Sequence, residues 1–386
     1  MTTYTRSLVR PERSFFLLGP RATGKTTWLR SVLPEARRYD LLREHELVRL
    51  TRDPGQLRRE VAALPHGTWV VIDEVQRLPQ LLDEVHALMA EEPDRYRFAL
   101  TGSSARKLRR GDVNLLAGRV ISRRFYPLTL QEIGDVEVDS LLRWGGLPLV
   151  RSASSDADRV DLLEAYSETY LAQEIRAEAV VRGLASFTRF LQVAALANGQ
   201  VTNTSAIARD AAVARPTVQG WFDVLQDTLV GAWLPAWRPR AKIKEQAHPK
   251  FYFFDTGAVR SLSGRLREPI DGLERGHLLE TWVFHELRAH ISYSGCGGEL
   301  AYWRTPSGSE VDFVWTRGDR AVAIEVKASD RWRPEHGRAL GALTASGVAQ
   351  RTLAVYLGSE RLRDGALHVL PMRDFAADLH AGLVLT

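Results

Sequence analysis

The feature that most constrains the fold is a glycine-rich loop between an apolar run and a helical segment. Its nine residues are Gly19, Pro20, Arg21, Ala22, Thr23, Gly24, Lys25, Thr26 and Thr27. The loop fits the pattern G-x-x-x-x-G-K-S/T, which needs a β-strand before it and an α-helix after it. The apolar run Phe15–Leu18 predicts that strand, and residues 26–33 predict the helix. A chance glycine turn is the alternative, but spacing, lysine, hydroxyl and context all agree on a phosphate-binding loop.

The residue types in this loop suit a nucleoside triphosphate with Mg²⁺. Gly19 and Gly24 allow successive backbone N–H groups to point at phosphate oxygens. Lys25 adds a positive charge at the β- and γ-phosphates, and the hydroxyl of Thr26 can bind Mg²⁺. The N-terminal end of the following helix adds partial positive charge beneath the phosphates. The sequence therefore predicts ATP and Mg²⁺ as ligands of this loop.

A second motif supports hydrolysis as well as binding. The apolar run Trp69–Ile72 ends in the two carboxylates Asp73 and Glu74. A continuous apolar run of this length suits a strand buried on both faces of a parallel sheet. Its C-terminal end would lie at the edge where open α/β sheets bind ligands. We expect Asp73 to hold Mg²⁺ and Glu74 to activate the attacking water as general base.

Composition limits the class of protein. The 386 residues predict two to four domains. Cys296 is the one cysteine, which excludes an internal disulfide framework and a cysteine-based zinc site. The first residues form no apolar leader, and no apolar run approaches membrane-spanning length. We expect a cytoplasmic protein without membrane contact.

Charge gives a weaker indication. The formal net charge is +5, which suggests nucleic acid without establishing it. Basic residues crowd residues 106–110 and residues 238–250. A solvated surface is the alternative interpretation of each segment.

The pattern of elements predicts an α/β protein with four parts. Residues 1–125 alternate apolar strands with helices, as a wound α/β core does. Residues 126–185 are mostly helical and suggest a small lid packed on that core. Residues 186–240 form a third unit, and residues 241–386 return to an α/β pattern with strands expected near residues 250–255, 300–304, 310–315, 321–327 and 353–356.

The third unit predicts a winged helix-turn-helix. A helix through Phe190, a turn at Asn198-Gly199, a helix capped near Asn203 and a helix beginning near Pro216 precede a hairpin arm. The second helix of the motif would present three side chains to a DNA groove. These are Arg215, Thr217 and Gln219. A winged helix used only as a protein interface is the alternative.

A second chemical constellation lies in the last part of the chain. Glu325 and Lys327 share one face of an otherwise apolar strand, and Asp312 lies on the preceding strand. Glu280 lies on the apolar face of an expected helix. Buried charge is costly unless it is paired or metal-bound. Three converging carboxylates predict a Mg²⁺ site that activates water, with Lys327 positioning the nucleophile, whereas a salt bridge of Lys327 is the alternative.

These motifs together resemble a prokaryotic family of AAA-type ATPases with a C-terminal domain of uncharacterised function. The resemblance covers nearly the whole chain. Its N-terminal motifs are the phosphate-binding loop, Val71–Glu74, Leu100–Ser104 and Leu116–Arg119. Its later motifs are Gly145–Pro148, Phe254–Gly257, Leu279–Val283, Glu310–Phe313 and Ile324–Lys327.

The resemblance implies further roles. In AAA-type ATPases a polar residue at Ser103 or Ser104 senses the γ-phosphate, although an N-cap serine is the alternative. Arg119 would act as a finger on the nucleotide of a neighbouring copy, which implies a homo-oligomer, or else cap a helix end. The last domain is similar to the PD-(D/E)XK nuclease fold, in which Glu280 would be the helix-borne acid and Asp312 and Glu325 would bind the metal beside Lys327.

The sequence thus predicts a Mg²⁺-dependent ATPase that acts on DNA, with a second metal centre in its C-terminal domain. A nucleotide-gated switch that binds protein partners, without nuclease activity, is one rival. A nuclease whose ATP site only regulates access is another.

Overall fold

The computed structural model describes residues 3–103, 116, 118–171, 183–238, 248–305, 308–345 and 347–385. The chain forms two compact units. The N-terminal unit comprises Arg6–Tyr126 and Asp223–Val230, and the C-terminal unit comprises Met1–Thr5, Pro127–Phe222 and Gly231–Thr386. None of the described helices is both long enough and apolar enough to pass through a lipid bilayer.

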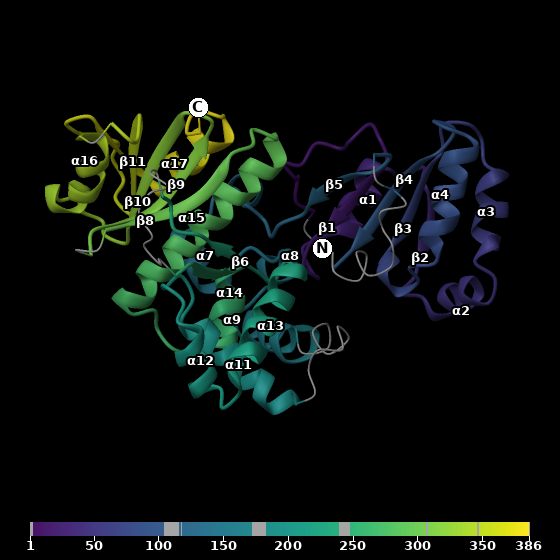
Figure 1. Cartoon of the computed structure of the whole chain (residues 1–386), viewed down its shortest axis with the longest axis horizontal. Helices are drawn as coiled ribbons and strands as arrows, with labels where there is room; N and C mark the ends of the chain where they lie inside the picture. Colours follow the sequence, from purple (N-terminus) through teal and green to yellow (C-terminus); the bar gives the residue numbers. More distant parts are fainter. Residues whose placement is uncertain are drawn as a thin grey trace. The chain divides into compact units, whose positions relative to one another are not determined.

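The N-terminal unit is a wound α/β domain, drawn in purple and blue in Figure 1. Its five strands form a parallel sheet in the order β2-β3-β4-β1-β5. Because β4 lies between β1 and β3, the loop after β1, the acids after β3 and the polar end of β4 meet at one edge. In chain order the elements are β1 (Phe15–Leu18), α1 (Lys25–Val32), β2 (Arg37–Asp40), α2 (Glu44–Arg52), α3 (Gly55–Ala62), β3 (Trp69–Asp73), η1 (Val75–Arg77), α4 (Leu81–Glu91), β4 (Arg97–Gly102) and β5 (Ile121–Arg124).

Helices cover both faces of this sheet. On one face α2, α3 and α4 contribute Leu50, Leu57 and Val85 to a core with the strand residues Phe16 and Ile72. On the other face Trp28 of α1 packs its ring 6.3 Å from that of Phe15 and 5.5 Å from that of Phe125. The alternation of Phe15 and Phe16 between the two faces is the period of two expected of a strand.

The first part of the C-terminal unit is mainly helical. Its core includes aromatic rings at α11, α13 and the β6–β7 pair: Phe190 lies 5.1 Å from Trp221, and Phe222 lies 4.7 Å from Phe251. The elements are α6 (Leu130–Ile133), α7 (Val138–Trp144), α8 (Pro148–Arg151), α9 (Asp156–Ala165), the π-helix η3 (Tyr166–Leu171), α11 (Leu184–Leu196), α12 (Thr204–Asp210), α13 (Arg215–Asp227), β6 (Gly231–Leu234), β7 (Lys250–Phe253) and α14 (Thr256–Leu262). Strands β6 and β7 pair antiparallel.

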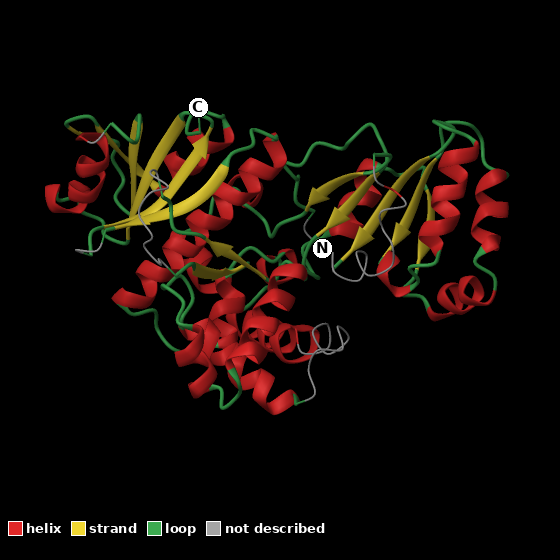
Figure 2. Cartoon of the chain, viewed as in Figure 1, coloured by secondary structure: helices red, strands yellow, loops and turns green. Residues whose placement is uncertain are grey.

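The rest of the C-terminal unit is a mixed six-stranded sheet with helices, seen in Figure 2 as the yellow strands near the C-terminus. The strand order is β12-β13-β11-β10-β9-β8, with β8, β9 and β10 antiparallel and β10 parallel to β11. The elements are α15 (Gly272–Ser294), β8 (Glu299–Arg304), β9 (Glu310–Arg317), β10 (Arg320–Lys327), η4 (Pro334–Gly337), α16 (Arg338–Ala345), β11 (Arg351–Tyr356), β12 (Leu362–Asp364), β13 (Leu367–Pro371) and α17 (Met372–His380).

Strands expected from apolar runs are present, whereas others, among them β2, β12 and β13, were missed. All five strands expected after residue 241 occur within one or two residues of their expected ends. Strand β2 escaped prediction because three of its four residues are charged and only Tyr39 is buried. Strand β12 is exposed along its length, so it carries no apolar signal.

The expected lid is grouped differently from the prediction. Residues 127–222 belong to the C-terminal unit, not to the nucleotide core. Hydrogen bonds explain this: the Leu130 N–H donates to Glu286 Oε1 at 2.6 Å, and the Thr256 hydroxyl donates to the Leu141 carbonyl at 2.9 Å. In addition the Gly146 N–H donates to Asp255 Oδ2 at 2.6 Å, which ties the Gly145–Pro148 turn to the start of α14. The four-part division itself stays a prediction.

Candidate functional sites

The glycine-rich loop forms a cradle between β1 and α1. Gly24 has φ of 93°, a left-handed conformation that glycine adopts without strain. A Cβ at Gly19 would lie 2.2 Å from the carbonyl oxygen of Phe125, so only glycine fits there. Helix α1 begins at Lys25, directly after Gly24, and its first N–H groups therefore face the loop. Such a helix start is a ready site for phosphate.

Lys25 is buried inside the cradle. Its ammonium donates hydrogen bonds to the carbonyls of Gly19 at 2.7 Å and Pro20 at 3.0 Å. The Thr23 hydroxyl also donates to the Pro20 carbonyl at 2.9 Å. These bonds curl the loop around the lysine, and an incoming phosphate can replace the carbonyls as acceptor.

Asp73 lies at the carboxyl end of β3 and contacts the loop directly. The Thr26 hydroxyl donates to Asp73 Oδ2 at 2.6 Å. The Thr101 hydroxyl at the end of β4 donates to the other carboxylate oxygen of Asp73. A hydroxyl and a carboxylate side by side at a phosphate cradle are oxygen donors of the kind that Mg²⁺ binds. The residues Thr26 and Asp73 therefore fit the predicted Mg²⁺ ligands.

Glu74 is held in a strained position next to Asp73. Its φ of 59° places a residue other than glycine in the left-handed region, a conformation that concentrates at functional sites. Its N–H donates to the Thr101 hydroxyl at 2.9 Å. The amide of Gln76 donates to Glu74 Oε2 at 2.6 Å and to the Ser103 hydroxyl at 3.0 Å. Gln76 thus connects Glu74, the expected general base, with Ser103, the expected sensor of the γ-phosphate.

Two of these residues were missed from the sequence. Thr101 lies inside the motif Leu100–Ser104 but was given no role, and Gln76 stands two positions after Glu74, where no pattern marked it. Gln76 Oε1 is buried with no hydrogen-bond partner among the described residues. Ser104, the other expected sensor, lies outside the described residues. Arg119 is exposed, with its guanidinium 3.3 Å from His86 Nδ1, so its role as a finger stays a prediction.

Arg6 is another residue that sequence reasoning missed. Its guanidinium donates to the carbonyl of Thr23 in the loop at 2.8 Å and to the carbonyl of Tyr126 at 2.6 Å. It also lies 4.0 Å from the ring centre of Phe125. The chain passes between the two units after residues 5, 126, 222 and 230. Within the N-terminal unit, one side chain therefore joins the phosphate cradle to Tyr126.

The second constellation gathers in the C-terminal unit. Asp312 on β9 and Glu325 on β10 face each other one step beyond the paired residues Phe313 and Ile324. Asp312 Oδ2 accepts the Val326 N–H at 2.8 Å, and Lys327 donates to Glu325 Oε1.

Glu280 joins this cluster from α15. Its Oε2 accepts the Tyr252 hydroxyl at 3.2 Å. Lys250 at the start of β7 lies 3.7 Å from Glu280 Oε2 and 2.5 Å from Glu310 Oε1. The sequence reasoning placed Lys250 in a basic segment and at the start of a strand, and it gave Lys250 no ion-pair partner. Its side chain is 4 % exposed. We name Glu280, Glu310, Asp312 and Glu325 the acid cluster.

Burial and mutual repulsion perturb the acid cluster. Burial, with the charge of Asp312, raises the pKa of Glu280 to about 8 and that of Glu325 to about 8. Burial also raises the pKa of Asp312, although Lys250 opposes the rise. Burial lowers the pKa of Lys250, but the surrounding carboxylates, Glu280 first, outweigh it and raise that pKa.

The acid cluster is not preformed for a metal. Within the part of the chain that the structure describes, no group of three or more His, Cys, Asp or Glu side chains is placed to hold a metal ion. Glu280, Asp312 and Glu325 come near one another as expected, but their role as Mg²⁺ ligands stays a prediction.

Comparisons with known proteins bear on these sites. Residues 11–134 match the family model of an AAA domain. Residues 136–268 match a domain of unknown function (DUF8612), and residues 275–375 match another domain of unknown function (DUF4143). The match, the parallel sheet and the cradle together support an AAA-type P-loop domain in the N-terminal unit, as the sequence analysis expected.

Two bacterial relatives are similar to this chain over most of its length. An uncharacterized protein of Mycobacterium tuberculosis is 29 % identical over 380 residues, covering 96 % of this chain and 80 % of the relative. An uncharacterized protein of Haemophilus influenzae is 24 % identical and covers 73 % of this chain and 72 % of the relative. The Orc1 protein of Aeropyrum pernix, solved in complex with DNA, is 14 % identical with a TM-score of 0.29, covering 66 % of this chain and 87 % of that chain. A score this low does not establish a shared fold.

The residues expected to contact DNA lie on α13. Arg215, Thr217 and Gln219 are exposed, whereas Val218 between them is buried. Asn203 caps α12 as expected, because its side chain accepts the N–H groups of Ser205 and Ala206 at 3.1 Å each. Of the two basic segments, residues 106–110 and most of residues 238–250 lie outside the described residues.

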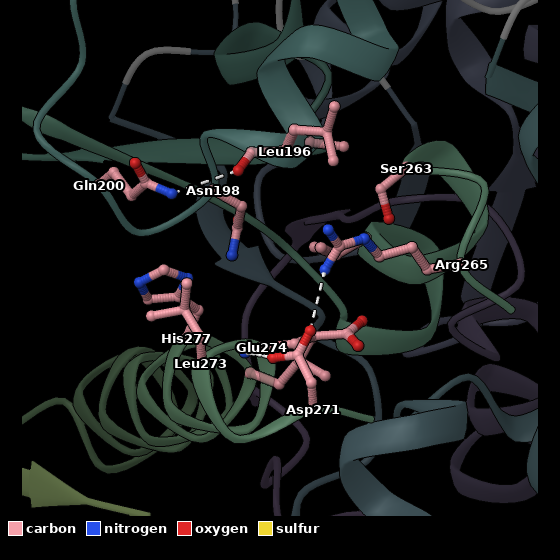
Figure 3. A pocket seen from close by; sticks show the side chains of 12 residues that line it. Leu196, Asn198, Gln200, Ser263, Arg265, Asp271, Leu273, Glu274 and His277 are labelled. Atoms are coloured by element: carbon pink, nitrogen blue, oxygen red, sulfur yellow. Dashed lines mark hydrogen bonds and ion pairs between the residues drawn. The ribbon is translucent and has the colours of Figure 1, made fainter. Parts of the chain in front are cut away.

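A small cavity of about 190 Å³ lies among α11, α14 and α15 (Figure 3). Its polar side chains mostly bond within the protein. Asn198 donates to the Thr281 hydroxyl at 2.7 Å and accepts the Phe253 N–H at 2.8 Å. Arg265 and Asp271, drawn across the cavity, form an ion pair at 3.9 Å. These contacts explain the cavity as part of the helix packing.

Proposed function

We propose that this protein is a Mg²⁺-dependent ATPase that uses ATP hydrolysis to act on DNA. The observation that carries the proposal is the contact of Thr26 with Asp73, with Glu74 and Ser103 linked beside it through Gln76. Lys25 would bind the β- and γ-phosphates, and Thr26 and Asp73 would hold Mg²⁺. Bound Mg²⁺ would neutralise the phosphate charge that develops during transfer.

Glu74 would take the proton of the attacking water. The strained backbone and the Gln76 hydrogen bond fix the carboxylate of Glu74 in direction. The Ser103 hydroxyl accepts a hydrogen bond from the same amide. Contact of Ser103 with the γ-phosphate would therefore affect the position of Glu74 through Gln76. A general base must lie within hydrogen-bond reach of its water, which is why such fixing supports hydrolysis and not binding alone.

We propose that DNA binds a winged helix-turn-helix built from α11, α12, α13 and the β6–β7 pair. The order of these elements, three helices and then two antiparallel strands, supports this interpretation. Arg215 would contact phosphate, and Thr217 and Gln219 would reach base edges.

The C-terminal sheet supports a PD-(D/E)XK-like fold, which we propose for residues 241–386. Helix α15 carries Glu280, β9 carries Asp312 and β10 carries Glu325 and Lys327, in the order that this fold requires. DNA cleavage there requires the acid cluster to gather around a cation, so we propose it as a conditional activity. We also propose a homo-oligomer, in which Arg119 would complete the ATP site of a neighbouring copy.

The second candidate is a nucleotide-gated switch that binds protein partners. The exposed start of α13 favours it, since Thr217 and Gln219 are uncharged and Arg215 is the basic residue among the three. Such a surface provides little of the phosphate attraction on which DNA binding depends.

The deciding experiment measures ATP hydrolysis with Mg²⁺, with and without duplex and single-stranded DNA, while DNA integrity is followed on a gel. We expect DNA to stimulate hydrolysis, Lys25→Ala to abolish it, and exposed Arg30→Ala on the same helix to leave it unchanged.

The DNA contact is tested separately. Arg215→Ala should reduce the stimulation of hydrolysis by DNA, whereas exposed Arg320→Ala in the same unit should not. Hydrolysis indifferent to DNA would favour the protein-binding switch. Cuts lost in Asp312→Ala would establish the nuclease.

A further inference from the structure

Lys250 is a buried ammonium among carboxylates that sequence reasoning assigned to a metal. It begins β7, and its backbone pairs with Leu234 on one side and Val201 on the other. Its side chain is almost fully enclosed, with Glu310 and Glu280 as its ion-pair partners. An ammonium is buried only where opposite charge compensates it. The acid cluster therefore holds a cation that the chain itself supplies.

The protein's own groups occupy the carboxylates at the Glu280 end of the acid cluster. One oxygen of Glu310 binds Lys250, and the other lies 3.6 Å from the guanidinium of Arg304. Oε2 of Glu280 faces Lys250 and the Tyr252 hydroxyl. A divalent cation placed here would have to take these same oxygens away from Lys250.

The Glu325 end of the acid cluster is less completely compensated. Glu325 Oε2 is buried without a hydrogen-bond partner among the described residues. Oε1 of the same carboxyl group accepts from Lys327, so within the described part of the chain only Oε2 lacks a partner there. A buried, unpartnered carboxylate oxygen is a free ligand for a hard cation such as Mg²⁺ or Mn²⁺. At the Glu325 end, the acid cluster thus has an oxygen that could bind such a cation. At the Glu280 end, the ammonium of Lys250 occupies the position that a cation would take.

We propose that the ammonium of Lys250 occupies the place of a divalent cation in the acid cluster and keeps the cluster metal-free until Lys250 is withdrawn. Glu280, Asp312 and Glu325 then form a latent site for Mg²⁺ or Mn²⁺. This inference does not depend on ATP hydrolysis. It rests on the proposed nuclease-like fold in one respect, the choice of Glu280, Asp312 and Glu325 as the metal ligands.

The position of Lys250 suggests what could withdraw it. The Tyr302 hydroxyl of β8 donates to the carbonyl of His248, two residues before Lys250, at 2.6 Å. The Tyr302 carbonyl accepts the Trp237 N–H at 2.6 Å, just beyond β6. Tyr302 thus binds both arms of the β6–β7 hairpin, and its ring centre lies 5.4 Å from the Lys250 ammonium. A ligand that moves this hairpin would move Lys250 relative to Glu280.

Mn²⁺ binding to the nucleotide-free full chain tests the proposal, by isothermal titration calorimetry with thermal unfolding alongside. The wild type should bind Mn²⁺ weakly and show little shift in its unfolding temperature. Lys250→Met should bind Mn²⁺ at least tenfold more tightly, and Mn²⁺ should raise its unfolding temperature relative to EDTA. Lys250→Arg keeps the charge and should behave as the wild type.

Two further variants keep the test decisive. Lys250→Met with Glu310→Gln removes the lysine and its partner charge together, so it serves where Lys250→Met alone does not fold. Adding Glu280→Gln to either variant should abolish the gained Mn²⁺ binding, which assigns it to the acid cluster and not to the ATP site. The proposal is overturned by tight, Glu280-dependent Mn²⁺ binding in the wild type, or by no gain in both lysine-free variants. ATP hydrolysis by the same proteins reports separately on the proposed function.

Discussion

Among the residues that the structure describes, Lys25 in the N-terminal unit and Lys250 in the C-terminal unit are both buried, and the two lysines are held in opposite ways. Lys25 donates to two neutral backbone carbonyls of its own loop, whereas the ammonium of Lys250 is held by Glu310 and Glu280. A lysine on carbonyls can exchange them for a phosphate that brings its own charge. A lysine among buried carboxylates is instead part of the charge balance that keeps the fold together. The same residue type thus indicates a ligand site in one unit and an internal ion pair in the other.

The largest effect expected from this contrast is on stability. Lys250→Met leaves Glu310 and Glu280 without their buried partner, so we expect a loss of about 3–5 kcal/mol in the free energy of unfolding. Lys25→Met removes hydrogen bonds to neutral carbonyls and should cost about 1 kcal/mol, while abolishing ATP hydrolysis. Urea unfolding of both variants in EDTA measures the difference. Equal losses of stability would contradict the contrast between the two lysines.

The next effect concerns the chemistry of the P-loop site. Glu74→Gln keeps the oxygen that accepts from Gln76 but cannot take a proton, so ATP hydrolysis should fall about 10²–10⁴-fold. Binding of ATP, measured by fluorescence of a labelled nucleotide, should change little. Exposed Glu35→Gln in the same unit is the matched control. A variant that still hydrolyses ATP at the wild-type rate would remove Glu74 as the general base.

A pH effect is expected from Glu286, a buried carboxylate of the C-terminal unit that lies outside the acid cluster. Burial raises the pKa of Glu286, which accepts the Leu130 N–H, from 4.5 to about 8. Its folded pKa exceeds its unfolded one, so its stabilising contribution is complete below pH 4.5 and is lost as pH rises through about 8. Stability should therefore fall between about pH 5 and pH 8, by up to about 1.4 kcal/mol per pH unit for this one group.

Glu286→Gln keeps the oxygen that accepts the Leu130 N–H but has no ionisable carboxyl group. The free energy of unfolding should therefore depend less steeply on pH between about pH 5 and pH 8. Urea unfolding at a series of pH values measures it, with exposed Glu299→Gln as control. An unchanged slope in Glu286→Gln would show that other carboxylates cause the pH dependence.

The smallest effect tests the link that Arg6 makes between the cradle and Tyr126. Arg6→Ala removes charge-assisted hydrogen bonds to Thr23 and Tyr126. A bond of this kind is worth about 1.5 kcal/mol, so we expect up to about a tenfold rise in KM for ATP. DNA stimulation of the remaining activity should also weaken. Arg10→Ala, which removes a surface pair with Glu12, should leave both unchanged.

The P-loop site could be predicted almost completely because its parts are local. The spacing of Gly19, Gly24 and Lys25 fixes a loop whose hydrogen bonds run within six residues. Asp73 at the end of an apolar run could be placed beside Thr26, since carboxyl ends of parallel strands share an edge. Thr101 and Gln76 could not be predicted, because their roles depend on β4 inserting between β1 and β3.

The C-terminal unit shows the limit of local patterns. Strand positions and the nearness of Glu280, Asp312 and Glu325 followed from apolar runs and charged interruptions in the sequence. Lys250 was assigned to a basic segment, because Arg238, Arg240, Lys242 and Lys244 precede it in the sequence. The grouping of residues 127–222 with the C-terminal unit was missed for a similar reason, since Glu286 lies 156 positions from Leu130.

The sequence by itself determined the chemistry of the glycine-rich loop, the acids after β3 and the strands that carry Asp312 and Glu325. Those features arise from spacing and apolar periodicity, which short stretches of chain express alone. Tertiary structure alone decided that Lys250 meets Glu310 and Glu280, sixty and thirty positions away in the chain. The charge state of a buried cluster depends on every group that the fold brings within a few ångströms, and no local pattern records that meeting.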